Sequence, residues 1–221
     1  MKRLIGVFLV VVFMAVGVSR GDAKKLSKKE KIRLTLGFET FKYWKKAGFI
    51  AEKKLVKEGK QAALWTDTED NERPYTKMLP HDLSGYKAMS IWIYSKTAND
   101  AKIAVVFNSE DEDSSGSDYY MMRILINWTG WKKLVIPFDV FKEVRSPVGF
   151  NKIDRLRFAA TGYKTGGAKE DTELILDDIK FLTAKELSAN KKYIYKGYTK
   201  KKKKKSKKSR KSKKVKEDWG E

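Results

Sequence analysis

The hydrophobic pattern is clearest between residues 118 and 138, where apolar and polar side chains alternate in two runs. A period of two is typical of a β-strand, and β-branched and aromatic residues dominate both runs. Thr129 and Gly130 lie between the runs and indicate a tight corner. We therefore predict two strands whose apolar sides need a facing sheet. The apolar side of the first run consists of Tyr120, Met122, Ile124 and Ile126.

Similar short runs occur at 60–66, 88–95, 102–109, 153–163 and 174–182, separated by polar turn residues. Few stretches show a helical period. Regularly spaced short strands predict an all-β fold, namely a two-sheet antiparallel jelly-roll sandwich. The domain is expected to open with the run that begins at Leu34, and segments 83–86 and 140–150 have the character of crossing connections.

The ends of the chain differ from this domain. Residues 1–23 have a basic start, an apolar stretch from Leu4 to Val18 and small residues before Lys24, which is typical of a signal peptide. The stretch is short for a membrane span, so we expect a secreted protein, extracellular or periplasmic, that does not span a membrane once cleaved. An uncleaved N-terminal anchor is the alternative. The predicted organisation is a signal peptide at 1–23, a basic lead-in without fixed order at 24–33, the sandwich at 34–187 and a tail at 188–221.

Charge is concentrated in the tail. The chain has a formal net charge of +21, yet residues 34–187 hold 24 basic and 23 acidic residues, whereas residues 191–221 hold 16 and 3. A run of like charge cannot collapse and predicts disorder. Without interleaved aromatic residues after Tyr198, it should bind an anionic polymer or surface through charge alone, not a specific nucleic-acid sequence; a merely solubilising extension is the alternative. The candidate polyanion-binding residues are Lys201, Lys202, Lys203, Lys204, Lys205, Lys207, Lys208 and Arg210.

Several segments in order resemble the carbohydrate-binding jelly rolls of the galactose-binding-like superfamily, in particular modules of family 11. These segments are Gly37-Phe38-Glu39 at an expected first strand with Trp44 after it, Lys57 to Lys60 before Ala62, Asp82 to Tyr86 before Met89, Thr129-Gly130-Trp131 before Leu134 to Phe138, Ile153-Asp154 with Leu156 and Phe158, and Leu176 to Ile179. The resemblance covers roughly residues 36–182. It implies a jelly roll that binds polysaccharide.

The resemblance also implies a structural calcium ion held by Glu39 near the start and Asp177 and Asp178 near the end. Calcium takes six to eight oxygen ligands, so carbonyl groups would complete the set. The alternative is that these acids pair with lysines or cap turns. The acidic segment 110–118 only partly matches an EF-hand loop, because Ser115 and Met122 stand where acidic ligands belong, and we expect a solvated hairpin loop there.

Sugar binding in a sandwich uses aromatic rings against pyranose faces and polar side chains against hydroxyl groups. A cationic side chain in the middle of an apolar strand indicates a solvated face. The candidate ligand-binding residues are Trp92, Tyr94, Tyr119, Arg123 and Arg157. The alternative for each is packing in the core or pairing with a surface carboxylate.

The expected function is that of a secreted, non-catalytic carbohydrate-binding module. The absence of cysteine excludes disulfides and thiol catalysis. With one histidine, few metal sites or catalytic triads are possible. A surface interaction protein of the same fold is the first alternative. A polysaccharide lyase using Tyr75, His81 and Arg123 is the second, although no motif or spacing supports it.

Overall fold

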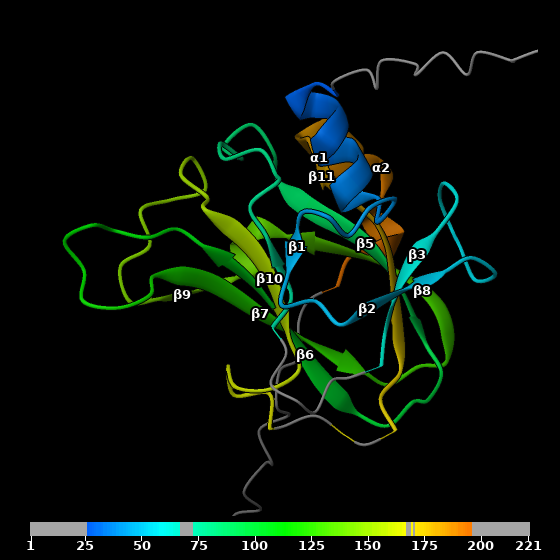
Figure 1. Ribbon diagram of the computed structural model, residues 1–221. Coiled ribbons are helices and arrows are strands. Elements are labelled where there is room, and N and C mark those ends of the chain that lie inside the picture. The colour runs from blue at the N-terminus through cyan, green and yellow to red at the C-terminus, as the bar shows by residue number, and fades with distance from the viewer. Residues whose placement is uncertain (1–25, 67–72, 167–168, 170, 196–221) are drawn as a thin grey trace, which may run out of the picture.

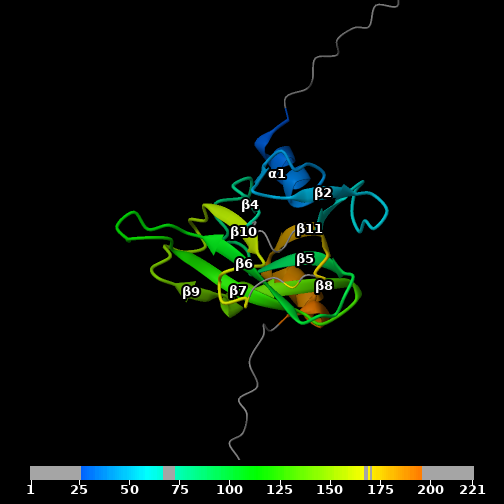
Figure 2. The same cartoon turned by 60° about the horizontal axis from the view of Figure 1, so that its bottom comes forward.

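The computed structural model describes residues 26–66, 73–166, 169 and 171–195 as two antiparallel sheets packed face to face, with short helices at their ends (Figure 1). The six-stranded sheet, here sheet A, has the order β1-β4-β10-β6-β7-β9. The five-stranded sheet, sheet B, has the order β2-β3-β11-β5-β8. The turned view in Figure 2 shows β6, β7, β9 and β10 on one side and β5, β8 and β11 on the other. A mostly β sandwich is therefore confirmed.

The strand bounds follow the predicted runs closely where the pattern is strong. Sheet A contains β1 (Trp44–Lys45), β4 (Tyr75–Thr76), β6 (Ala101–Asn108), β7 (Tyr119–Ile126), β9 (Lys142–Val144) and β10 (Arg155–Ala159). Sheet B contains β2 (Phe49–Glu52), β3 (Ala62–Trp65), β5 (Ala88–Ser95), β8 (Gly130–Pro137) and β11 (Leu174–Leu182). The helices are α1 (Lys28–Leu36), α2 (Ala184–Ala189) and the 3-10 turns η1 (Phe138–Val140) and η2 (Lys191–Tyr193).

The corner at residues 127–130 carries the chain from one sheet to the other. β7 pairs with β6 in sheet A, whereas β8 pairs with β5 in sheet B. Gly130 has φ 78°, a left-handed conformation that suits glycine at such a corner. The apolar sides of both strands then face the same interior, where Ile124 and Leu134 are fully or almost fully buried.

Aromatic rings fill the two ends of the core between the sheets. At one end Trp44 stacks on Phe38 at 5.3 Å and on Phe158 at 5.9 Å. At the other end Phe150 stacks on Tyr120 and Phe138 at 4.3 and 4.4 Å. These large residues join the strands to the connecting segments, because Phe138 and Phe150 belong to the crossing connections rather than to the sheets.

The lead-in and the beginning of the tail are ordered, contrary to the prediction. α1 covers much of the segment expected to lack order, and Gly37 to Glu39 follow this helix instead of forming a first strand. The side chain of Ser27 caps α1 by accepting a hydrogen bond from the Glu30 amide. α2 and η2 likewise extend structure past residue 187, as far as the described residue 195. The rest of the predicted tail, including Lys201 to Arg210, lies outside the described residues, as does the predicted signal peptide.

Candidate functional site on the outer face of sheet A

The candidate site is the solvent side of sheet A, opposite the core. Its floor consists of small or slender buried side chains, Ala104 and Val106 on β6, Met121 on β7 and Ala159 on β10. Tyr119 and Tyr163 pack against this floor. By strand alternation and register, the polar members are Tyr75, Asn108, Arg123, Arg155 and Arg157. These residues together are called the outer face of sheet A below.

Tyrosine and arginine side chains contact one another across this face. The Tyr75 ring lies beneath two guanidinium groups, with Arg157 at 5.5 Å and Arg155 at 5.7 Å from its centre. Arg157 also donates a hydrogen bond of 2.9 Å to the Tyr163 hydroxyl. Tyr163 in turn meets the edge of Tyr119, with the ring centres 5.4 Å apart. Burial, the largest cause, raises the pKa of Tyr119, so its hydroxyl is a neutral hydrogen-bonding group at neutral pH.

Several polar atoms of this face have no hydrogen-bond partner among the described residues. They are Nε of Arg73, Arg155 and Arg157 and Oδ1 of Asn108, all of which are shielded from solvent. A shielded polar atom without a partner costs about 1 to 3 kcal/mol, so such atoms are rare in a face that serves packing alone. Their concentration beside half-buried tyrosine rings marks this face as a polar surface and not only a packing surface.

The loop after β10 raises Tyr163 over the sheet. Gly162, Tyr163 and Lys164 all have positive φ, at 70°, 47° and 57°. The Thr165 hydroxyl fixes this turn by donating to the carbonyl oxygens of Ala160 and Gly162 at 2.8 and 2.7 Å. Non-glycine residues in this conformation cost free energy and are enriched at ligand sites.

A cleft of about 470 Å³ continues the face beyond Tyr75 toward β1. The phenol rings of Tyr43 and Tyr75 and the aliphatic side chain of Met78 supply its apolar surface. Among the described residues, three lysines complete the lining and no acidic residue takes part: Lys42, Lys45 and Lys77. The cleft and the outer face of sheet A thus share Tyr75 and form one continuous surface.

The predicted ligand-binding residues divide between two opposite surfaces. Tyr119, Arg123 and Arg157 lie on the outer face of sheet A, as their alternation indicated. Trp92 and Tyr94 lie on the solvent side of sheet B, where both meet the Trp131 ring edge-on, at 6.4 and 5.6 Å. A single sugar chain bound on one face cannot contact all five residues.

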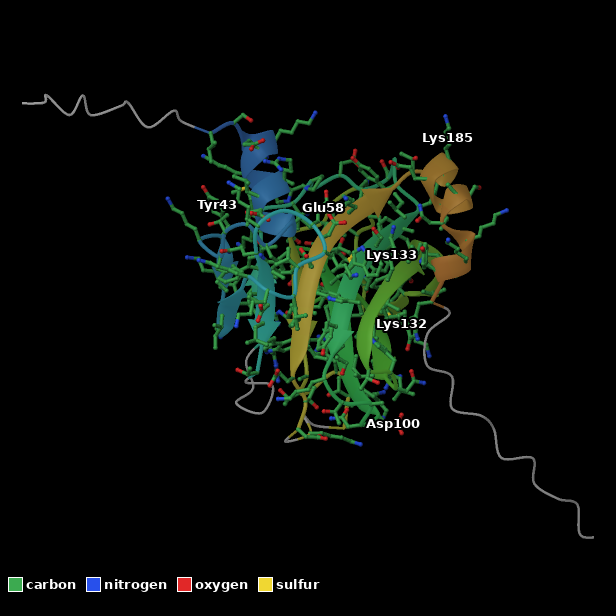
Figure 3. All side chains as sticks on the ribbon, turned by 90° about the vertical axis from the view of Figure 1, so that its right-hand side faces the viewer. Tyr43, Glu58, Asp100, Lys132, Lys133 and Lys185 are labelled. Carbon is green, nitrogen blue, oxygen red and sulfur yellow. The ribbon has the colours of Figure 1, made fainter. Side chains whose placement is uncertain are left out.

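The solvent side of sheet B is partly covered by other segments of the chain. Figure 3 looks on to this side and shows the loop that carries Glu58 crossing over β11, with α2 beyond β8. In that loop the Lys57 ammonium group lies 5.0 Å from the Trp92 ring and 5.6 Å from the Trp131 ring. Leu187, Tyr193 and Ile194 cover the other end by packing on Val135 and Ala88. Sheet A is therefore the better candidate.

The residues proposed to hold calcium meet at the loop 57–60. The Lys60 amide donates to Glu39 Oε1 at 2.9 Å, and the amides of Lys57 and Glu58 donate to Asp177 Oδ2 at 2.7 and 3.0 Å. Asp177 Oδ1 is shielded and has no partner in the described chain. Burial, the largest cause, raises the pKa of this carboxyl group despite its backbone hydrogen bonds.

These contacts fit a cation only in part. An ion beside Asp177 would supply the partner that Oδ1 lacks, and Glu39 contacts the same loop. Asp178 instead follows the bulge of β11, with φ 51°, and pairs with Lys180 at 2.9 Å. Among the described residues, no three His, Asp or Glu side chains come together as a metal site. Backbone carbonyl groups and water would have to complete six ligands.

The acidic loop between β6 and β7 is organised by its own side chains. Buried Asp118 accepts hydrogen bonds from the Ser146 amide at 3.0 Å, the Ser114 hydroxyl at 2.9 Å and the Asp111 amide at 3.3 Å. The Ser146 amide is the largest cause of the lowered pKa of Asp118. Part of this loop is more ordered than the solvated hairpin that we predicted.

The geometry gives no support to the lyase alternative. Tyr75 on β4 and Arg123 on β7 share one face but are three strand spacings apart, roughly 14 Å at about 4.8 Å per step. His81 lies outside the strands, and its Nδ1 is 2.6 Å from the Ile153 carbonyl oxygen. Among the described contacts, none joins any two of these three side chains.

Comparison with known proteins shows similarity in fold. No protein-family model matches the chain, and no curated protein does. The solution structure of CtCBM11 matches with a TM-score of 0.50 and 18% identity over 67% of this chain and 92% of that one. A family 11 carbohydrate-binding module from Clostridium thermocellum, in complex with a β-1,3-1,4-mixed-linked tetrasaccharide, matches with a TM-score of 0.49 and 20% identity over 67% and 93%.

The fold of the described chain is thus similar to that of the family 11 module CtCBM11. A family 30 carbohydrate-binding module also matches, with a TM-score of 0.46 and 12% identity over 64% of this chain and 87% of that one. The resemblance predicted from the sequence is thus confirmed for the fold. At these identities the comparison does not carry ligand residues from those modules to this chain.

Sequence reasoning missed several residues of the candidate site. Tyr43, Arg73, Arg155 and Tyr163 were not among the predicted ligand-binding residues. The alternation Arg155-Leu156-Arg157 was a usable signal, because two arginines on one side of a strand require a polar environment. Tyr163 gave no such signal, since its position depends on the conformation of a loop.

Proposed function

We propose that this chain is a secreted, non-catalytic carbohydrate-binding protein whose outer face of sheet A binds a polysaccharide. The observation that carries the proposal is the array of tyrosine rings and arginine side chains over a floor of small side chains. Rings of this kind stack on pyranose faces, and guanidinium groups donate hydrogen bonds to hydroxyl groups. The described helices leave this face open, since α1 and α2 both contact β11 of sheet B.

The basic tail extends the same proposal. Its lysines would add affinity for an anionic polymer or surface, because a second binding segment on the same chain raises the effective concentration of the first. The support is charge alone, 16 basic against 3 acidic residues at 191–221. Secretion is supported by the composition of residues 1–23. No helix in the described part of the chain has the length and apolar character needed to cross a membrane.

A structural calcium ion is also proposed, held by Glu39 and Asp177 at the loop 57–60. When bound, the ion would supply positive charge to a carboxyl group that burial otherwise disfavours in its ionised form. Glu39 and Asp177 are far apart in the sequence, so such an ion would tie the beginning of the domain to its last strand.

A glycan array followed by titration calorimetry tests the binding face. Tyr75→Ala and Tyr119→Ala should each lower the affinity for the bound glycan by about tenfold or more, as expected for rings central to an interface. Trp92→Ala is the matched control on sheet B and should leave the affinity unchanged. Loss of binding in Trp92→Ala with full affinity in both tyrosine variants would move the site to sheet B.

A further inference from the structure

The arginines of the domain are gathered on one face. Residues 34–187 contain five arginines, at positions 73, 123, 145, 155 and 157, within a nearly balanced set of charges. Arg123, Arg155 and Arg157 belong to the outer face of sheet A, and the guanidinium of Arg73 lies 5.6 Å from the Tyr163 ring at its margin. Arg145 follows β9 and donates a hydrogen bond to the Ser115 carbonyl oxygen of the acidic loop, close enough for its charge to act on Tyr119. A balanced domain thus presents a cationic face.

In the described chain, one carboxylate reaches these four arginines. Glu110 pairs with Arg155 at 2.9 Å. The described hydrogen bonds of Arg123 and Arg157 are to neutral groups: Arg123 donates to the Lys164 carbonyl oxygen at 2.9 Å, and Arg157 donates to the Tyr163 hydroxyl. Arg123 and Arg157 are partly buried, and a charge removed from water favours a counter-charge that the ligand can supply.

The described lining of the adjoining cleft has the same sign of charge. It consists of tyrosine, methionine and three lysines, with no acidic residue among these described residues. A sugar chain that runs from Tyr75 toward Tyr43 would therefore meet positive charge from this lining. A neutral glycan gains nothing from this arrangement, whereas an acidic one gains at every cation that it approaches.

We propose that the outer face of sheet A selects polysaccharides that contain uronic acids. This inference rests on the proposed function. A guanidinium group is a planar fork that matches a carboxylate with two parallel hydrogen bonds, and the Tyr75 ring holds two such groups beside a surface on which a pyranose can stack. Arg157 and Arg123 are the residues assigned to the carboxylates, because Arg155 is already paired with Glu110.

The test compares acidic oligosaccharides with their own neutral forms. Hexasaccharides of glucuronan, polygalacturonate and alginate are titrated into the full-length protein by calorimetry, each beside its carboxyl-reduced form. Binding at least tenfold tighter to one acidic form than to its reduced form is expected, since a charged hydrogen bond contributes that much or more. Equal or tighter binding of the reduced form would overturn this inference and leave the proposed function standing. Absence of binding to any of these glycans and to a neutral glycan array would overturn both.

Variants show whether the outer face of sheet A or the tail causes the preference for acidic glycans. Arg157→Gln and Arg123→Gln should each lower the affinity for the preferred acidic hexasaccharide about tenfold and that for its reduced form less than twofold. Arg33→Gln makes the same change on α1, which contacts sheet B, and should alter neither. Melting curves establish that each variant is folded. Replacing Lys201 to Lys205 by serine should leave the preference in place, and its loss in that variant alone would assign the selection to the tail.

Keratan sulfate oligosaccharides, which carry sulfate groups and no uronic acid, distinguish the source of negative charge. Sulfate is also bound by arginine, but the carboxylate match predicts weaker binding of the sulfated oligosaccharide than of the preferred uronate at equal charge. Tighter binding of the sulfated oligosaccharide that both arginine variants reduce equally would contradict the assignment to uronic acids.

Discussion

Asp118 organises the acidic loop as a single residue that accepts three hydrogen bonds from the segments around it. The sequence placed it at the end of an acidic run and suggested only solvated charge. Its burial could not be predicted, because Ser146, which donates one of these bonds, is distant along the chain. For Glu39 and Asp177, in contrast, the resemblance to a known family predicted that the two residues lie close together. Both side chains do contact the same loop.

The lowered pKa of Asp118 predicts a dependence of stability on pH. A carboxyl group with a lowered folded pKa stabilises the fold above its ordinary value near 4, and this contribution is lost as the pH falls through the folded value. Asp118→Asn should therefore melt at a lower temperature than the wild type at pH 7, and the two curves should converge toward pH 3. Glu112→Gln, whose side chain is 92% exposed, is the control and should match the wild type throughout. A difference that stays constant with pH would contradict the account.

Calcium should raise the melting temperature of the wild type and not that of Asp177→Asn. A ligand that binds only the folded state stabilises it by mass action, and protonation of Asp177 should weaken the effect in acid. Glu39→Gln should reduce the effect, whereas Asp178→Asn, whose carboxylate pairs with Lys180, should change it little. Identical melting curves of the wild type in calcium and in excess chelator would show that calcium does not stabilise the fold.

At the scale of elements, the strands with strong alternation were predictable and the helices were not. The runs at 88–95 and 174–182 coincide with β5 and β11. The helices α1 and α2 each follow a Ser or Thr with Glu three residues later, a capping signal at Ser27 and Thr183 that the surrounding lysines obscured. The pattern also could not assign β7 and β8 to different sheets, because alternation gives the faces of a strand and not its neighbours.

The segment after α2 protects strand edges that would otherwise be open. β9 pairs with β7 only at residues 119–121, and beyond that point the Leu125 amide donates to the Tyr195 hydroxyl at 2.8 Å. The Tyr195 amide donates to the Val135 carbonyl oxygen on β8, also at 2.8 Å. One tyrosine thus forms hydrogen bonds with the edge strands of both sheets. These bonds occupy backbone groups that could otherwise pair with a strand of another chain.

Removing this hydroxyl group should weaken the edge. Tyr195→Phe leaves the Leu125 amide without its acceptor and should lower the free energy of unfolding in urea by about 1 to 2 kcal/mol. Tyr193→Phe is the control, because it keeps the ring that Lys133 contacts at 5.2 Å. Hydrogen exchange at Leu125 should accelerate in the first variant only. Unchanged exchange there would show that the hydroxyl does not hold the edge.

At the scale of the whole molecule, the proposed function combines two kinds of binding on one chain. The folded domain has almost balanced charge with its arginines on one face, and the strongly basic residues follow it in the sequence. The division of charge between domain and tail could be predicted from the sequence. The concentration of arginines on sheet A could not, since it arises from the order β4-β10-β6-β7.

The dependence of affinity on salt should distinguish binding by the tail from binding by the domain. A tail that neutralises many anionic groups releases counterions, so its affinity falls steeply with ionic strength, whereas stacking and one or two ion pairs depend on salt weakly. Deleting residues 200–216 should flatten the salt dependence of binding to long polygalacturonate and keep the binding of short oligosaccharides. Unchanged affinity for the long polymer at low salt after this deletion would exclude the tail as a polyanion-binding segment.

Chemical-shift mapping of backbone amides during glycan titration tests the central claim most directly. With the glycan that binds most tightly in the array, the account predicts that shifts concentrate at 104–108, 119–123 and 155–159 on sheet A and around Tyr75 and Tyr163. The chemical shifts of the amides at 90–94 and 131–135 on sheet B should not change. Shifts concentrated on sheet B, with sheet A unaffected, would contradict the account.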